Sequence, residues 1–230
     1  MKKRTIFLLI VVLTTVSTFA RSIRKEFNLP IFNKIEIGSA FSVKISQGNT
    51  QSVVFDIDEE LFNYLKADVA GNKLKIRLEN KIWKRGYDNL KVFITVTDLQ
   101  GLEVGGACNV NFETAIESDE IKINLSGASR LSGERINANK TKIGLSGASH
   151  LNVGLHSSQL TLEASGASRA ILKGNADKQS FEASGASNIE ASDLSGESAR
   201  VEASGASNIK LGTKSISHMN ISGASSIKTK

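Results

Sequence analysis

The sequence predicts an all-β protein built as a single-stranded β-solenoid, and three observations lead to that prediction. The tetrapeptide SGAS occurs six times after residue 125, and a degenerate copy, GGAC, precedes the first of them. The spacing between copies is nearly constant, and apolar residues alternate with polar ones on both sides of each copy. A repeat of about 19 residues is too short for a helix and two strands, but it suits one coil of a solenoid. The corner glycines of the seven copies are Gly106, Gly127, Gly147, Gly166, Gly185, Gly205 and Gly223.

The alternation on either side of this corner predicts two strands in every repeat. The residues one and three positions before the corner are all apolar, as are those two positions after it. The residues between the two leading columns are not apolar, and this period of two is typical of a strand with one buried face. We therefore expect each strand to pair in parallel with its counterpart in the next coil. The outward column consists of Glu103, Asn124, Gly144, Glu163, Glu182, Glu202 and Asn220.

Small residues at the corner have a structural explanation. Glycine tolerates the positive φ that a sharp bend demands. We expect the corner alanine to point inward, and the flanking serines to hydrogen-bond to the backbone and to one another. The functional alternative is a row of serine nucleophiles, each of which needs an adjacent base. Because the chain has three histidines in all, His150, His156 and His218, we favour the structural explanation.

The first twenty residues, MKKRTIFLLIVVLTTVSTFA, predict a secretory signal peptide. A positively charged start precedes an apolar core and a plausible cleavage site after Thr18-Phe19-Ala20. An uncleaved membrane anchor is the alternative, but the apolar run is short for a spanning helix. We expect an exported protein, located in the periplasm, at the outer membrane surface or outside the cell. Cys108 is the only cysteine, so core burial rather than an intramolecular disulfide must hold the fold together.

Residues 21–230 are expected to form one domain, with irregular N-terminal coils and a cap in 21–100 and the regular repeats in 101–230. Segments resembling strands occupy much of the first part, and GSAF at 38–41 resembles an eighth corner. Apolar residues at helical spacing predict a helix within 58–69. The irregular part of residues 21–100 is expected to cap the open end of the solenoid, since a bare terminal coil exposes strand edges and apolar interior.

The motifs of the mature chain resemble those of a known family. The segments FNKIEIGSAFSVKISQG and LKIRL, followed by repeated LSGAS and ASGASNI, are similar to the family described as "putative autotransporter adhesin, head GIN domain". The resemblance extends from Arg21 to Lys230. It implies a right-handed parallel β-helix of pectate-lyase-like architecture in an exported bacterial protein. It supplies no established activity and no functional residues.

Two groups of residues are candidate binding sites. The column Glu163, Glu182 and Glu202 stacks three carboxylates, which either bind a cation or form a solvated face balanced by nearby positive charge. The segment 79–89 carries Trp83, Arg85 and Tyr87, which either contact a sugar or protein or pack against the cap.

A third column is basic. Arg130, His150 and Arg169 follow three successive corners and are either an anion or sugar-acid contact or an ordinary polar face. The histidines lack metal-ligand spacing, so we expect neither a metal site nor a cofactor. Removing the signal peptide leaves a formal net charge of +6 − 3 = +3, and no aromatic-studded basic patch indicates nucleic-acid binding.

Uniform repeats without a catalytic constellation predict a non-catalytic protein. The leading hypothesis is an exported interaction module of the cell envelope or surface, with an adhesive or carbohydrate-binding specialisation and glycans or envelope or host surface proteins as partners. One alternative is a lyase-like enzyme that acts on polysaccharides with the same scaffold. Another is a purely structural envelope protein.

Overall fold

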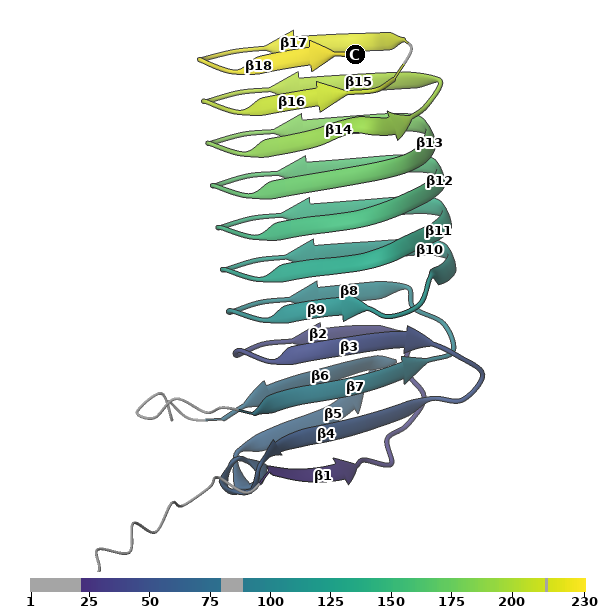
Figure 1. Cartoon of the computed structure of the whole chain (residues 1–230), viewed down its shortest axis with the longest axis vertical. Coiled ribbons are helices and arrows are strands. Elements are labelled where there is room, and N and C mark those ends of the chain that lie inside the picture. The colour runs from purple at the N-terminus through teal and green to yellow at the C-terminus, as the bar shows by residue number, and fades with distance from the viewer. Residues whose placement is uncertain (1–21, 80–88, 214) are drawn as a thin grey trace, which may run out of the picture.

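The computed structural model describes residues 22–79, 89–213 and 215–230, and it is a β-solenoid (Figure 1). The predicted fold class is therefore confirmed. Successive coils lie on top of one another as a rod, with the sharp corners along one edge. The predicted signal peptide and Trp83, Arg85 and Tyr87 lie outside the described residues.

Each coil contains one strand that enters the corner and one that leaves it. The entering strands form what we call the first sheet, and the leaving strands form the second sheet. Three long strands leave one corner in the second sheet and enter the next corner in the first: β11 (Arg130–Leu145), β12 (His150–Ala164) and β13 (Arg169–Ala183). The other first-sheet strands are β2 (Lys34–Ile37), β8 (Gly101–Val104), β10 (Ile116–Leu125), β15 (Ser198–Ala203) and β17 (Ile216–Ile221). The other second-sheet strands are β3 (Ser42–Gln47), β9 (Asn109–Phe112), β14 (Asn188–Ser195), β16 (Asn208–Leu211) and β18 (Ser226–Thr229).

The strands pair in parallel from coil to coil, and the register places equivalent residues over one another. Leu125 lies opposite Leu145, which lies opposite Ala164, so the apolar column one position before the corner is continuous. These columns form a buried core along the rod, as expected from the alternation. The last coil is the exception, because Met219 and Ile221 each remain 46% exposed where no further strand covers β17.

The corner requires glycine for two separate reasons. Gly147 has a φ of 69°, which residues with a side chain rarely adopt. A Cβ atom there would also lie 2.6 Å from the carbonyl oxygen of Gly127 in the preceding coil. That carbonyl accepts a 2.8 Å hydrogen bond from the N–H of Ala148, so it cannot move away. The eighth corner has Ser39 in the glycine position, with φ 74°, and its Oγ accepts a hydrogen bond from the N–H of Leu78.

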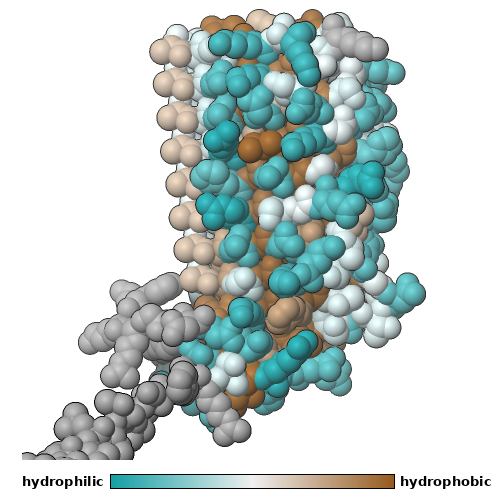
Figure 2. Space-filling model, viewed as in Figure 1, coloured by the Kyte–Doolittle hydropathy of each residue, from teal (hydrophilic) through white to brown (hydrophobic). Residues whose placement is uncertain are grey.

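The expected orientation of the corner alanine is wrong. Ala128 and Ala148 are exposed, whereas Ser129 and Ser149 are buried. The alanines form the continuous column of pale brown spheres along the left edge of Figure 2. The reason is the direction in which the bend turns the chain: the residue after the glycine faces solvent, and the next one returns to the inward face.

An antiparallel cap covers the N-terminal end of the rod. The chain forms the coil β2–β3, continues outward past it, and returns so that β6 and β7 pair with β2 and β3. Further out, β4 pairs antiparallel with both β7 and β1, and β5 pairs antiparallel with β6. The cap strands are β1 (Ser22–Glu26), β4 (Ser52–Asp58), β5 (Leu65–Ala70), β6 (Lys73–Leu78) and β7 (Leu90–Val96).

The helix expected within 58–69 is largely wrong. Only Glu59–Asn63 is helical, as a short 3-10 turn, and Leu65–Ala70 is a strand. Residues Leu65, Ala67 and Val69 also alternate with period two, and their less exposed side chains belong to one face of β5. The turn at Gly71 and Asn72, both with positive φ, joins β5 to β6 as a hairpin, and this pairing decides the structure. Within the ranges that the structure covers, no helix has the length and apolar character needed to span a bilayer.

Candidate functional site

A continuous groove follows the outer surface of the first sheet, and it is the candidate functional site. It consists of three adjoining hollows of about 470, 330 and 380 Å³. Glu103 and Asn124 line both the first and second hollows, and Asn124 and Ser126 line both the second and third. The groove therefore runs along the rod across several coils rather than across a single strand.

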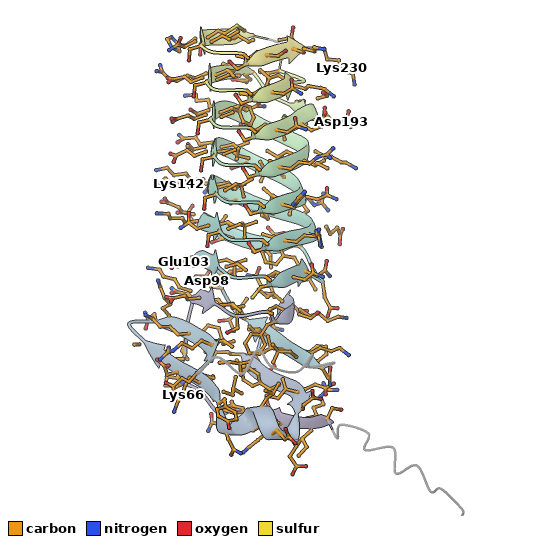
Figure 3. The ribbon with its side chains drawn as sticks, turned by 90° about the vertical axis from the view of Figure 1, so that its left-hand side faces the viewer. Lys66, Asp98, Glu103, Lys142, Asp193 and Lys230 are labelled. Carbon is orange, nitrogen blue, oxygen red and sulfur yellow. The ribbon has the colours of Figure 1, made fainter. Side chains whose placement is uncertain are left out.

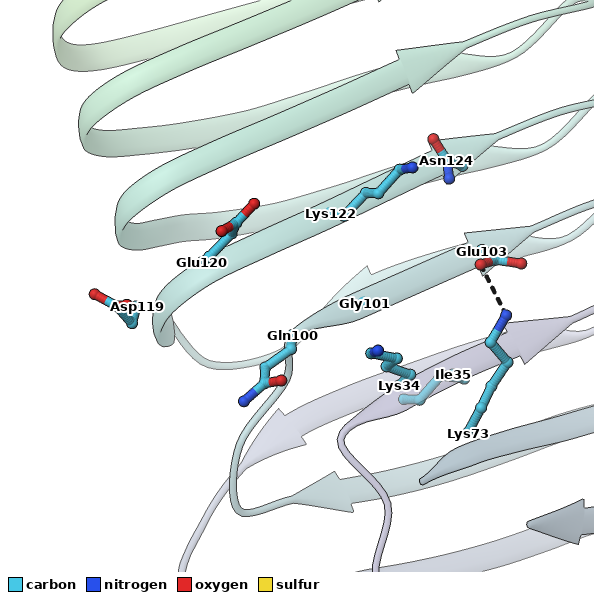
Figure 4. A pocket seen from close by; sticks show the side chains of 10 residues that line it. All are labelled: Lys34, Ile35, Lys73, Gln100, Gly101, Glu103, Asp119, Glu120, Lys122 and Asn124. Atoms are coloured by element: carbon cyan, nitrogen blue, oxygen red, sulfur yellow. Dashed lines mark hydrogen bonds and ion pairs between the residues drawn. The ribbon is translucent and has the colours of Figure 1, made fainter. Parts of the chain in front are cut away.

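The first hollow exists because β8 has a glycine where the neighbouring coils have lysines. Gly101 lies in register with Lys34 on one side and Lys122 on the other. Figure 4 shows these residues around the hollow, together with Gln100 and Asn124. Because Gly101 has no side chain, the aliphatic stem of Lys34 and the backbone of β8 form part of the groove surface.

Ion pairs border this hollow on both sides. The Nζ atom of Lys73 is 2.9 Å from Glu103 Oε1 and 3.5 Å from Glu36 Oε2. The hydrogen bond to Glu103 is the main reason that the pKa of Lys73 is raised above its ordinary value. On the other side Lys142 donates a 2.8 Å hydrogen bond to Glu120, which lowers the pKa of that carboxyl group. These charges are therefore already paired within the protein.

Lys34 and Lys122 differ from these paired groups. Neither has a carboxylate within 4.0 Å among the described residues. Their ammonium groups can donate hydrogen bonds to hydroxyl or carboxylate oxygens of a ligand in the first hollow.

The third hollow has a similar origin. Gly144 lies in register between Asn124 and Glu163, so the outward column lacks a side chain at this coil. A Cβ atom there would lie 2.7 Å from Asn124 Oδ1, which shows how closely the asparagine covers the gap. Serines of successive corners line one side of this hollow, and Glu163 and Glu182 are part of its lining.

The structure places the glutamate column partly inside the groove. Glu163, Glu182 and Glu202 lie in register on β12, β13 and β15. Glu163 and Glu182 line the third hollow, whereas Glu202 accepts hydrogen bonds of 2.6 and 3.1 Å from the guanidinium group of Arg200. Figure 3 shows how side chains project from both flanks of the rod, with Glu103 and Lys142 on one flank and Asp193 and Lys230 on the other.

Two kinds of catalytic arrangement are absent among the residues that the structure describes. Within these ranges no serine hydrogen-bonds to a histidine, and no three His, Cys, Asp or Glu side chains gather as metal ligands would. Cys108 is buried, and burial raises the pKa of its thiol to about 11, so at neutral pH it is a protonated, inaccessible group. Its Sγ donates a hydrogen bond to the carbonyl of Gly38.

Reasoning from the sequence missed the groove itself. The sequence pattern identifies Gly144 only as a non-apolar member of the outward column, and it does not single out the column four positions before the corner. That column reads Lys34, Gly101 and Lys122 in successive coils. The available signal was a glycine at an outward strand position where the backbone conformation does not require glycine, because such a residue leaves a gap in the row of side chains.

Several solved structures have a similar fold. A protein of Parabacteroides distasonis described as a "putative adhesin" superposes with a TM-score of 0.80 at 16% identity over 92% of this chain and 98% of its own. A "putative adhesin" of Parabacteroides merdae gives 0.78 at 16% identity over 91% and 96%. A "putative lipid binding protein" of Parabacteroides distasonis gives 0.72 at 18% identity over 91% and 96%. At these identities the similarity establishes the shared fold alone.

The sequence comparisons agree with the structural ones. None of the curated proteins matches this chain. The model of one family does match, over residues 31–230, which include every corner of the rod and the whole groove. The chain therefore belongs to the family described as "Putative auto-transporter adhesin, head GIN domain".

Proposed function

We propose that this protein is an exported, non-catalytic interaction module of the cell envelope or surface, and that it binds an extended ligand along the groove of the first sheet. The observation that carries the proposal is the continuity of the three hollows over successive coils. A ligand with a repeating backbone can lie along such a groove and contact several equivalent positions. Export is supported by the predicted signal peptide and by the family to which the chain belongs.

The groove lining favours a carbohydrate chain. Ammonium groups of Lys34 and Lys122, the amide of Asn124 and corner hydroxyls such as that of Ser126 provide hydrogen-bond donors and acceptors. An acyl chain would leave these groups without partners, and unpaired polar groups weaken binding. The descriptions of the similar structures as adhesins agree with this choice, although one of those structures is described as lipid binding.

Filling the groove tests this proposal. The double variant Gly101→Gln and Gly144→Gln places two side chains in the first and third hollows. Neither glycine has a positive φ, and the atoms nearest to an added Cβ belong to the flexible side chains of Lys34 and Asn124. We expect the protein to bind a glycan family on an array and the variant to lose that binding.

The matched control is Ser158→Gln, which likewise adds a glutamine side chain at an exposed strand position, but on β12 outside the three hollows and outside the corner columns. It should leave glycan binding unchanged. Absence of any glycan binding by folded wild-type protein, or equal binding by the groove-filled variant, would remove the support for a carbohydrate site in the groove.

A further inference from the structure

A column of three basic side chains stands on the second sheet, on the face opposite the groove. Arg130 lies in register with His150, and His150 with Arg169, each directly after a corner. All three residues are exposed. Adjacent strands are about 4.8 Å apart, so the column presents basic groups at equal steps along the rod.

This column differs from the other stacked positive charges among the described residues. Lys44 pairs with Glu113, Lys142 with Glu120, and Lys210 with Glu190 in neighbouring coils. Where two lysines are in register, as Lys122 and Lys142 are, at least one has a carboxylate partner. By contrast, no member of the basic column has a carboxylate within 4.0 Å in the part of the chain that the structure describes.

The two guanidinium groups of the column stand on the same face, two strands apart, with His150 between them. Like charges at this separation repel each other weakly across water. The nearest carboxylate column does not relieve this repulsion, because Glu190 accepts hydrogen bonds from Lys210 at 2.7 Å and Ser192 at 2.6 Å. These two contacts, led by Lys210, are the main causes of the lowered pKa of Glu190, and Arg169 contributes the smallest share. Glu190 therefore offsets only a small part of the positive charge at Arg169, and no carboxylate lies within 4.0 Å of the column among the described residues.

Most polar neighbours of the column are uncharged groups that can hydrogen-bond, and Glu190, which is paired with Lys210, is an exception. Asn109 continues the column below Arg130, and Asn188 continues it above Arg169. The adjacent outward column contains Asn111, Ser132 and Asn152, and the hydroxyl of Ser132 donates to Asn111 Oδ1 at 3.0 Å. Amides and hydroxyls beside two guanidinium groups and an imidazole match a ligand that carries both hydroxyl and acidic groups.

We propose that Arg130, His150 and Arg169 form a binding strip for an acidic polysaccharide, whose regularly spaced anionic groups lie along the rod axis. A single small anion would contact only one or two members of the column, whereas a polymer contacts all three. The strip is separate from the groove, because Glu163 and Glu182 make the groove unsuitable for a polyanion. The inference therefore stands whether or not the groove binds a neutral glycan.

The test measures binding of polygalacturonate by titration calorimetry at several salt concentrations, with neutral dextran and duplex DNA as comparison polymers. Changing Arg130 and Arg169 together to glutamine should weaken binding about tenfold at low salt. It should also reduce the slope of log binding constant against log salt concentration by about one for each charge removed. The control Lys66→Gln with Lys178→Gln removes the same net charge outside the second sheet and should leave binding near that of the wild type. The added-charge variant Asn188→Arg extends the strip by one coil and should strengthen binding.

Three results would overturn the proposal. Equal weakening in the control pair would assign the binding to overall charge, and failure of Asn188→Arg to strengthen it would remove the role of the column. Duplex DNA bound as tightly as polygalacturonate would indicate general attraction of polyanions rather than recognition of an acidic sugar. The arginines and lysines that are changed are exposed and Asn188 is half-buried, so circular dichroism should confirm that each variant keeps the wild-type fold.

Discussion

The serines at the ends of each corner share a single carbonyl acceptor in the coil below. In the corners nearer the N-terminus the first serine of SGAS is within hydrogen-bond distance of this carbonyl, as Ser146 Oγ lies 3.5 Å from Leu125 O. In the corners nearer the C-terminus the last serine of SGAS bonds to it instead, as Ser187 Oγ donates to Ala164 O at 3.2 Å. The change coincides with the change from leucine to alanine in the inward column, because alanine leaves room for the hydroxyl of the last serine to reach the backbone. Ser129, Ser149 and Ser168 consequently have buried hydroxyl groups without partners.

This difference predicts opposite effects of the same substitution. Ser149→Ala removes a buried hydroxyl that has no partner and should raise the free energy of unfolding by about 1 kcal/mol. Ser187→Ala removes a hydroxyl that is bonded and should lower it by about 1 kcal/mol. Urea denaturation of both variants measures the two changes. Equal destabilisation by both would mean that Ser149 has a hydrogen-bond partner after all.

The buried thiol of Cys108 makes stability depend on pH at the alkaline end. Its pKa is about 11 in the folded protein against an ordinary value of 9.0. The folded state thus holds the proton more tightly than the unfolded chain does. This contribution is complete below pH 9 and is lost as the pH rises from 9 to 11.

Replacing the thiol should remove this pH dependence. The wild-type protein should lose about 2 kcal/mol more stability than Cys108→Ser between pH 8 and pH 11. Because lysines and tyrosines titrate in both proteins, the difference between the two urea denaturation series isolates the thiol. Parallel loss of stability in the two proteins would contradict the assignment.

At the scale of an element, the corner shows why one glycine is essential and a neighbouring one is not. Gly147→Ala places a Cβ atom at positive φ and against a backbone oxygen at 2.6 Å, so it should lower the free energy of unfolding by at least about 2 kcal/mol. Gly144→Ala, three residues earlier, meets only the Asn124 side chain and should be neutral or slightly stabilising. Thermal denaturation of the pair compares the two positions in one strand and corner. An equal loss of stability in both variants would show that the positive φ of Gly147 and its close backbone contact do not determine the stability of the corner.

The strands of the regular coils could be predicted from the sequence because hydropathy distinguishes their two faces. Leu125 and Leu145 alternate with Asn124 and Gly144, so both the period and the buried face are evident. The corner itself could not be predicted in the same way. Alanine and serine differ little in size and hydropathy, so nothing local determined that Ala148 faces solvent and Ser149 faces the core.

The cap and the groove could not be predicted from one repeat, because both depend on which strands pair and in which register. The helical spacing of Leu61, Leu65 and Val69 is compatible with a strand from Leu65 onward, and only pairing with β6 decides between them. The return of β6 and β7 beneath β2 and β3 reverses the order of coils relative to the sequence. The groove arises from Gly101 and Gly144 only after register places them beside longer side chains, so it became visible only in three dimensions.

The whole molecule combines a closed end with a stack of similar units. The cap fixes the first coil between β6–β7 and β8–β9, so the N-terminal third cannot be shortened without exposing the core. Each later coil pairs in parallel with its neighbours and packs its core side chains against theirs. Stability in such arrays is approximately a sum of the contributions of the units and of their interfaces.

Removal of the last coil tests whether the rod behaves as this stack. A chain that ends at Thr213 loses β17 and β18 but keeps the 2.6 Å hydrogen bond from Thr213 Oγ1 to the buried Gln179 Oε1. We expect it to remain folded, with wild-type far-ultraviolet circular dichroism and a urea m-value smaller by about a tenth, since m scales with the surface exposed on unfolding.

A chain that ends at Ala203 is the contrasting case. It loses β16 as well, so the interior face of β14 at Ile189 and Ala191 is no longer covered, and the hydrogen bond to Gln179 is lost. The free energy of unfolding of this chain should fall below that of the chain ending at Thr213 by more than the loss of the pairing of one strand explains. If truncation at Thr213 already unfolds the protein, then the coils are held together by contacts beyond their nearest neighbours, and the rod is a single cooperative unit rather than a stack of separable ones.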